Sequence, residues 1–157
     1  MAIIKHTNPC CFASYEEPVA KLYERALSEG DAVSTYGGIV ATNRPIDLAL
    51  ATALREAPSP VTGTRMFFEI VIAPGFEGEG LEHLKKKSKD LRILTVPAGD
   101  PRRPRLELKS LRGGVLVQES DLSEERDFEL VSDRAPTDAE LADLRLAWHV
   151  CKHVKSN

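Results

Sequence analysis

The feature that most constrains the fold is an alternation of strand-like and helix-like patterns along the 157 residues. Strand-like runs are short and rich in β-branched residues. They are Ile3-Ile4, Ile39-Val40, Ile70-Val71-Ile72, Ile93-Leu94-Thr95-Val96 and Val115-Leu116-Val117. Their apolarity is continuous rather than alternating, which is typical of strands covered on both faces by helices. We therefore predict a layered α/β fold.

Segments between and after these runs have apolar residues at helical spacing. They lie at about residues 16–29, around 48–54, around 81–84, and after residue 137. Gly30 supplies a stop for the first helix. Thr137, followed three residues later by Glu140, is a capping-box signal for the start of the last helix, whose apolar stripe runs to Cys151. The length fits a single domain spanning residues 1–157.

Composition argues against several functional classes. The net charge is −3, so no basic field favours nucleic acid, and the dense basic run Lys85-Lys86-Lys87 is interpreted as a solvated helix face. No apolar stretch approaches the roughly 20 residues that a membrane span needs. The start of the chain also lacks the charged and apolar regions of a signal peptide, so a cytoplasmic protein is expected. Three cysteines are too few for a disulfide framework, which favours reduced thiols. Cys151 lies in an apolar helical pattern and is expected to be a core residue.

A candidate site lies where the first apolar run ends. Lys5 and His6 place a permanent cation beside a general-base candidate. Adjacent strand residues face opposite sides, so both side chains serve one site only if the strand ends there, and Asn8-Pro9 is expected to supply that ending. Taken alone, a Lys-His pair at a strand end is more often structural than catalytic.

Blocks spread over the whole chain resemble one family. Lys5-His6-Thr7-Asn8-Pro9 resembles the K-H-x-N-P-x-G motif that opens the formyltransferase domain of the bifunctional enzyme AICAR transformylase/IMP cyclohydrolase. Further similar blocks follow in the family's order: 34–41 with 43–45, 69–76, 111–114, and 147–148 through 155–157. The resemblance implies a cytidine-deaminase-like α-β-α sandwich of three layers around a mixed, largely parallel sheet. This chain would be the first of two such copies, in a longer protein that is a homodimer.

The resemblance also implies a reaction and its residues. Formyl would pass from 10-formyltetrahydrofolate to the amine of aminoimidazole carboxamide ribonucleotide in purine biosynthesis. His6 would act as the base, Lys5 would stabilise the transition state, and Asn157 would orient the formyl group. Gly37 would let the backbone approach the nucleotide, and Glu69 would accept hydrogen bonds from it. The alternative for Gly37 is an ordinary turn, and for Glu69 a paired carboxylate in a sheet.

Three features fit the resemblance less directly. Cys11 stands where the family has glycine; if that position requires positive φ, cysteine costs about 1 kcal/mol or more there. Arg44, Arg112 and Gln118 belong to matched blocks, but we can assign them no role beyond turn geometry or anion contact. A zinc deaminase would need Pro-Cys-x-x-Cys with a His-x-Glu, a pattern that Pro9-Cys10-Cys11 lacks, so no zinc and no other metal is expected.

Two hypotheses of different class remain. In the first, the chain is part of a folate-dependent formyltransferase. In the second, the chain alone is a catalytically silent nucleotide-binding or scaffold fragment. The second follows from the expectation that the family's cyclohydrolase domain precedes this segment, and that residues binding folate and phosphate lie largely beyond it.

Overall fold

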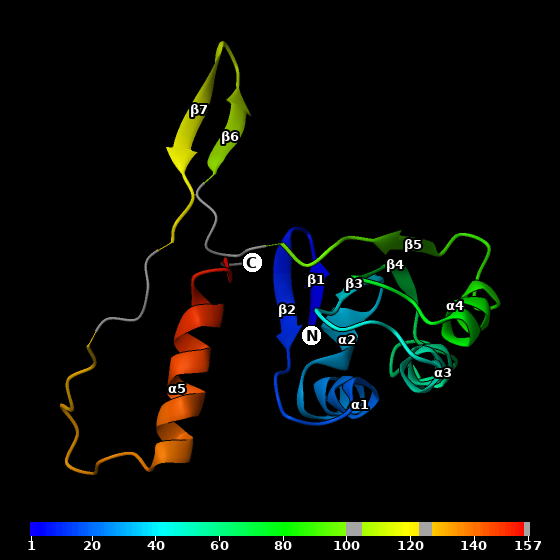
Figure 1. Ribbon diagram of the computed structural model, residues 1–157, viewed down its shortest axis with the longest axis horizontal. Coiled ribbons are helices and arrows are strands. Elements are labelled where there is room, and N and C mark those ends of the chain that lie inside the picture. The colour runs from blue at the N-terminus through cyan, green and yellow to red at the C-terminus, as the bar shows by residue number, and fades with distance from the viewer. Residues whose placement is uncertain (100–104, 123–126, 156–157) are drawn as a thin grey trace. The chain divides into compact units, whose positions relative to one another are not determined.

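The computed structural model describes residues 1–99, 105–122 and 127–155 (Figure 1). The chain divides into two compact units. Unit 1 comprises Met1–Ala98 with His149–Asn157, and unit 2 comprises Gly99–Trp148. Among the described residues, no helix is both long and apolar enough to cross a membrane.

Unit 1 is built on a five-stranded sheet. Its strands are β1 (Ala2–Lys5), β2 (Asn8–Phe12), β3 (Gly38–Ala41), β4 (Phe68–Ala73) and β5 (Arg92–Thr95), in the order β2-β1-β3-β4-β5. β1 is antiparallel to both of its neighbours, whereas β3, β4 and β5 pair in parallel. β1 is therefore the one strand of this sheet that runs against the other four. The predicted α/β fold with a mixed, largely parallel sheet is confirmed.

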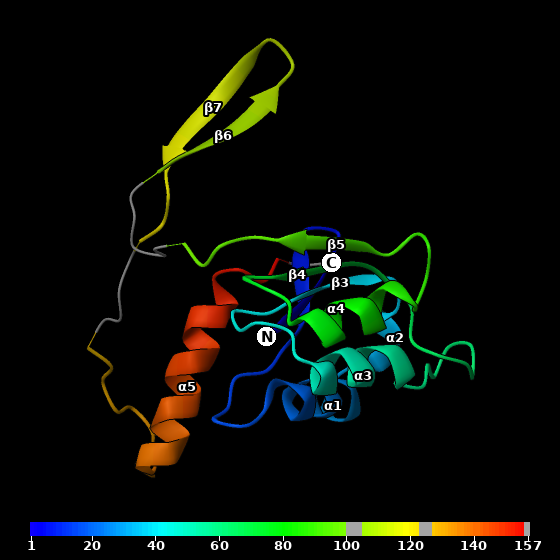
Figure 2. The same cartoon turned by 45° about the vertical axis from the view of Figure 1, so that its right-hand side comes forward.

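Four helices complete the main body of unit 1: α1 (Val19–Glu29), the short α2 (Ala32–Thr35), α3 (Leu48–Glu56) and α4 (Gly78–Lys85). Helices α1, α3 and α4 lie side by side along one face of the sheet (Figure 2). Ile3, Val40 and Val71 point to that face and are fully buried in the core. Because successive side chains in a strand alternate, Ile4 and Ile39 point to the other face and are only half-buried.

The first helix starts later than its periodicity predicts. The apolar pattern predicts a helix from about residue 16, but α1 begins at Val19, directly after Pro18. A residue that precedes proline is pushed out of the helical conformation, which disfavours helix at Glu17. The predicted stop is confirmed, because α1 ends at Glu29 with Gly30 as its C-cap.

The basic run predicted a solvated face for Lys87, and this prediction is wrong. Its ammonium donates hydrogen bonds to the carbonyls of Leu54 (3.0 Å) and Met66 (2.7 Å) and lies 5.1 Å from the centre of the Phe68 ring. Burial lowers the pKa of Lys87 to about 8. The side chain therefore ties the end of α3 to the segment that leads into β4.

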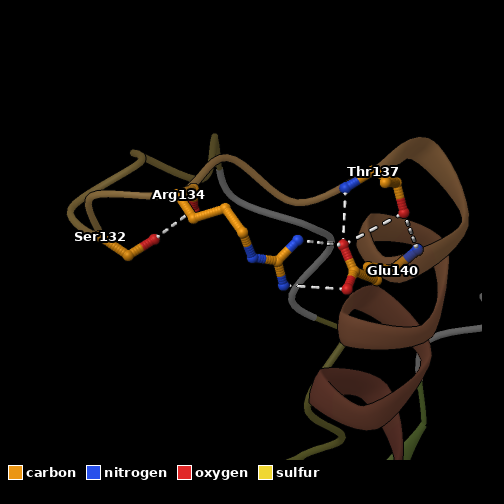
Figure 3. Close-up of polar contacts among 4 residues, drawn as sticks. All are labelled: Ser132, Arg134, Thr137 and Glu140. Atoms are coloured by element: carbon orange, nitrogen blue, oxygen red, sulfur yellow. Dashed lines mark hydrogen bonds and ion pairs between the residues drawn. The ribbon is translucent and has the colours of Figure 1, made fainter.

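Unit 2 contains a β-hairpin, β6 (Leu106–Leu111) with β7 (Gly114–Glu119), and helix α5 (Asp138–Cys151), most of which belongs to this unit. The capping box that begins α5 is confirmed (Figure 3). The Thr137 hydroxyl accepts from the backbone N–H of Glu140, and the Glu140 carboxylate accepts from the backbone N–H of Thr137 at 2.8 Å. Arg134 adds a bidentate pair at 2.9 Å, and these contacts lower the pKa of Glu140 to about 2.

The apolar stripe of α5 is not buried. Among the described residues, α5 has no buried side chain, and Trp148 is 55% exposed. Cys151 is also exposed, so the expectation that it belongs to the core is wrong. Periodicity marks which side of a helix is apolar but does not say what covers that side.

Candidate functional site

The opening strand ends in a two-residue turn made by His6 and Thr7. β1 ends at Lys5, β2 begins at Asn8, and these two residues pair across the hairpin. His6 has φ 55° and Thr7 has φ 61°. Positive φ at both central residues is the pattern of tight hairpin turns whose twist matches that of the strands. We predicted that Asn8-Pro9 ends the first strand. These residues instead begin the second strand.

This backbone is unusual for its residues. Positive φ is uncommon outside glycine and is a real outlier for a β-branched residue such as Thr7. Residues held in such regions cost of order 1–3 kcal/mol each and cluster at functional sites. Pro9 causes no comparable conflict, because β2 is an edge strand of the sheet and proline is tolerated at an edge. The turn presents an exposed His6 next to a half-buried Lys5.

Lys5 is oriented by a backbone carbonyl. Its ammonium donates a hydrogen bond of 2.8 Å to the carbonyl oxygen of Tyr36. Tyr36 directly precedes Gly37, so the structure brings two of the predicted site residues, Lys5 and Gly37, together. A cation held in one place beside a base can act on charge that develops during a reaction.

The two glycines after Tyr36 are required for different reasons. Gly37 has φ 76°, and a Cβ built there meets only the Phe67 ring, at 3.8 Å, so conformation rather than space demands glycine. At Gly38 a Cβ would lie 2.9 Å from both Ile3 Cγ2 and the Thr35 carbonyl oxygen, so no side chain fits. Gly37 is thus a turn residue, and its backbone N–H donates to the Phe67 carbonyl oxygen at 2.9 Å.

Glu69 lies on β4, next to the residue that pairs with Gly38. Its carboxylate forms an ion pair with Arg92 of β5 at 2.9 Å, and the two side chains are 47% and 61% exposed. The paired-carboxylate alternative is therefore present in the structure, although exposed pairs stabilise a fold by only about 0–1 kcal/mol. Strand register places Glu69 near the start of β4, at the same end of the strands as Gly37 and the end of β1.

The last described residues return to this end of the strands. The Asn8 side chain donates to the carbonyl oxygen of Lys155 at 2.9 Å and accepts from the Lys155 N–H at 2.6 Å. Asn157, the predicted formyl-orienting residue, lies outside the described residues. Sequence reasoning used Asn8 only as a strand end and missed its contact with Lys155, because a contact across 147 positions leaves no local pattern.

The residues without an assigned role have structural contacts. Arg44 donates to the carbonyl oxygens of Glu17 (2.9 Å) and Tyr15 (3.4 Å), which fixes the segment before α1. In unit 2, Gln118 donates to Glu107 across the hairpin at 3.5 Å, and Arg112 lies in the hairpin turn. None of these contacts indicates a ligand.

Neither a cavity nor a metal-binding cluster is found at the turn within the described residues. A cavity of about 710 Å³ lies between α1, α3 and the segment 57–60, and none of its lining residues belongs to the predicted site. Within residues 1–99, 105–122 and 127–155 there is no group of three or more His, Cys, Asp or Glu side chains placed to hold a metal ion.

Cys11, which stands where the family has glycine, lies in β2. Among the described residues, positive φ outside glycine occurs at His6 and Thr7, so the strand position of Cys11 needs no glycine. Its thiol donates to the Ala26 carbonyl at 3.3 Å, and burial raises the pKa of the Cys11 thiol, which disfavours a reactive thiolate.

We expect Cys11→Gly to change the formyl transfer that the resemblance implies for the longer protein by less than about tenfold, or 1.4 kcal/mol. The substitution should lower the free energy of unfolding by about 0.5–1 kcal/mol, because glycine in a strand interior loses more backbone entropy. Steady-state kinetics and urea unfolding measure the two effects. A larger loss of turnover with unchanged stability would mean that the thiol takes part in the chemistry.

The candidate site therefore lies at one end of the sheet strands, where the Lys5 ammonium, the exposed His6, the Gly37 turn and the returning segment at Lys155 are found. The chain belongs to the AICARFT/IMPCHase bienzyme family, whose profile matches residues 1–157.

Among its relatives are proteins named bifunctional purine biosynthesis protein PurH. Those of Thermoanaerobacter sp. and Nostoc punctiforme are 46% and 45% identical over 156 and 157 residues, which covers 98% and 99% of this chain. That of Persephonella marina is 40% identical over 155 residues. The chain spans 28% of the length of each of these relatives.

Proposed function

We propose that the protein containing this chain transfers a formyl group from 10-formyltetrahydrofolate to the 5-amino group of aminoimidazole carboxamide ribonucleotide. The observation that carries the proposal is the Lys5–Tyr36 hydrogen bond of 2.8 Å, which holds the ammonium at the carbonyl of the residue before Gly37. His6 follows Lys5 directly in the chain. Membership of the AICARFT/IMPCHase family supports the choice of substrates.

The chemistry needs a base and a cation together. The acceptor amine is a weak nucleophile because its lone pair is delocalised into the imidazole ring. As the amine nitrogen bonds to the formyl carbon, neutral His6 takes a proton from it, and the formyl oxygen gains negative charge. The ammonium of Lys5 stabilises that oxyanion. Collapse of the tetrahedral intermediate then breaks the bond to the folate nitrogen, and protonated His6 gives its proton to that nitrogen as it leaves.

The remaining residues are proposed to hold the reactants. Gly37 lets the backbone approach the nucleotide, and the Glu69 oxygen that Arg92 does not occupy accepts hydrogen bonds from it. Asn157 donates its side-chain amide to the oxyanion. No step needs zinc or another metal.

The proposal extends to the whole protein. The half-buried outer face of the sheet, with Ile4 and Ile39, is covered in the complete enzyme, which completes a three-layer, cytidine-deaminase-like sandwich. Residues 1–157 form one domain of a cytoplasmic homodimer that binds no nucleic acid or membrane, and a second copy of the fold supplies the folate and phosphate contacts.

The alternative is that the chain alone is a silent nucleotide-binding or scaffold fragment. The exposed position of His6 favours it, because an exposed imidazole has no surrounding surface to orient a substrate. The two candidates are compatible if the complete protein is active and the chain alone is not.

The test is formyl transfer by the full-length protein, followed by release of tetrahydrofolate. We expect turnover by the wild type and a loss of about 10²–10³ in kcat for Lys5→Arg, because a guanidinium spreads the charge over a larger planar group and moves it away from the position of the ammonium. Lys89→Arg is the matched control, since Lys89 is exposed, and it should leave kcat unchanged. Inactive wild-type protein would contradict the function; normal kcat for Lys5→Arg would contradict the role of Lys5.

A further inference from the structure

Asn8 makes an arrangement that a side chain seldom provides. Its amide both donates to and accepts from the backbone of one residue, Lys155, at 2.9 and 2.6 Å. The side chain thus imitates a neighbouring strand, which satisfies the N–H and the C=O of one residue at once. Two bonds to one residue fix its orientation as well as its distance. Asn8 is only 7% exposed, so little water competes for these groups.

The position of Asn8 connects this contact to the candidate site. Asn8 directly follows the His6–Thr7 turn and is the strand partner of Lys5. Lys5 in turn donates to the Tyr36 carbonyl. A continuous series of contacts therefore runs from Tyr36 to Lys155: a hydrogen bond from Lys5 to Tyr36, the strand pairing of Lys5 with Asn8, and the hydrogen bonds of Asn8 with Lys155.

We propose that Asn8 is a positioning residue for formyl transfer, which aligns the closing segment at Lys155 with the Lys5–His6 turn. This inference rests on the proposed function. Asn8 touches neither substrate nor reacting atoms in this account. It acts through the segment that leads to Asn157, whose amide is proposed to bind the oxyanion. A misplacement of about 1 Å can cost a reaction about 10²-fold, so alignment matters beyond the stability of the fold.

The side-chain chemistry at position 8 is specific. The contact needs one donor and one acceptor, which a neutral amide supplies. A carboxylate supplies acceptors only, so it would lie against the Lys155 carbonyl oxygen with no hydrogen-bond donor for it. A purely structural anchor would lower the free energy of unfolding when it is removed and leave the chemical step alone. The two roles are therefore separable by experiment.

The first test is a double-mutant cycle in the full-length protein. We expect Asn157→Ala to lower kcat by about 10²–10³ and Asn8→Ala to lower it by about 10–100, with smaller changes in KM. If Asn8 acts through Asn157, then Asn8→Ala should cost less than about threefold in the Asn157→Ala background. Losses that multiply would overturn the inference, as would normal kcat for Asn8→Ala.

The control for stability is Ser59→Ala. Ser59 is 2% exposed, and its hydroxyl accepts from the backbone N–H groups of Val61 (3.2 Å) and Thr62 (3.3 Å), so it too is a buried side chain with two backbone contacts. Ser59→Ala should lower the free energy of unfolding about as much as Asn8→Ala, but retain kcat. An equal loss of kcat in both variants would assign Asn8 a structural role only.

The second test uses Asn8→Asp, which makes the contact depend on pH. Above its pKa the carboxylate cannot donate to Lys155; below it, the protonated acid donates to the carbonyl and still accepts from the N–H. The kcat of Asn8→Asp divided by that of the wild type should therefore rise as the pH falls from about 8 to about 5.5. A flat or falling ratio would overturn the inference.

A final readout is independent of activity. Amide exchange at Lys155 should accelerate in Asn8→Ala, whereas exchange at Ala13, whose N–H bonds to the Met1 carbonyl, should not. Unchanged exchange at Lys155 would overturn the contact itself. An inactive wild-type protein would refute the proposed function instead, so the two failures are distinguishable.

Discussion

The 157-residue chain, assayed alone, is expected to fold its sheet and to form no detectable formylated product. His6 lies on an exposed turn, so nothing in the described part of the chain surrounds it to hold folate against the acceptor amine. Positioning of reactants contributes about 7–11 kcal/mol to lowering a barrier, which corresponds to about 10⁵–10⁸ in rate. An intact base without positioning is therefore silent.

The measurement compares the chain alone, the full-length protein, and the chain mixed with the remaining part of that protein. Circular dichroism and resistance to proteolysis establish that the chain is folded in the assay. We expect activity only where the remaining part is present, and no activity from the mixture when the chain carries His6→Ala. Turnover by the chain alone near that of the full-length protein would contradict this expectation.

The second large effect is expected for His6→Ala in the full-length protein. A positioned general base contributes about 10²–10⁴ to rate, so kcat should fall by that factor. Equilibrium binding of the nucleotide should weaken much less, because His6 is assigned to proton transfer. Isothermal titration with the nucleotide and steady-state kinetics separate these two quantities.

His83→Ala is a matched control for that experiment. His83 lies on α4, away from the β1–β2 turn, and has no part in the proposed chemistry. It should retain kcat. If His6→Ala keeps normal turnover at saturating substrate, substrate-assisted transfer through the carboxamide becomes the better mechanism.

The strands were predictable because burial selects β-branched residues there. The runs at Ile3-Ile4, Ile39-Val40 and Ile70-Val71-Ile72 all lie in the central sheet. β2 was missed. Its sequence, Asn8 to Phe12, contains a proline and two cysteines and predicts a turn. β2 is a strand because it pairs with β1 at the edge of the sheet, where proline is tolerated.

The turn itself could not be predicted from residue preferences. Tight hairpins of this kind favour Asn-Gly or Gly, whereas this chain places His6 and Thr7 at positive φ. The surrounding sheet imposes that conformation against local preference. Such conflicts between local and global structure are expected at functional sites rather than elsewhere.

The candidate site was predictable in part. Resemblance identified Lys5 and Gly37, which the structure brings together, and it identified Glu69, whose pairing with Arg92 was the open alternative. The contact between Asn8 and Lys155 depends on tertiary structure alone. Lys87 shows the same limit, since a basic run predicts a solvated face and carries no sign that one ammonium turns to backbone carbonyls.

The most direct test of the catalytic role of the turn is the single-turnover rate of formyl transfer by full-length His6→Ala, measured with and without added imidazole. We expect a rate about 10²–10⁴ below the wild type that rises with imidazole concentration, because free imidazole enters the space left by His6 and accepts the proton. A rate near that of the wild type without imidazole would contradict the role of His6 as the base.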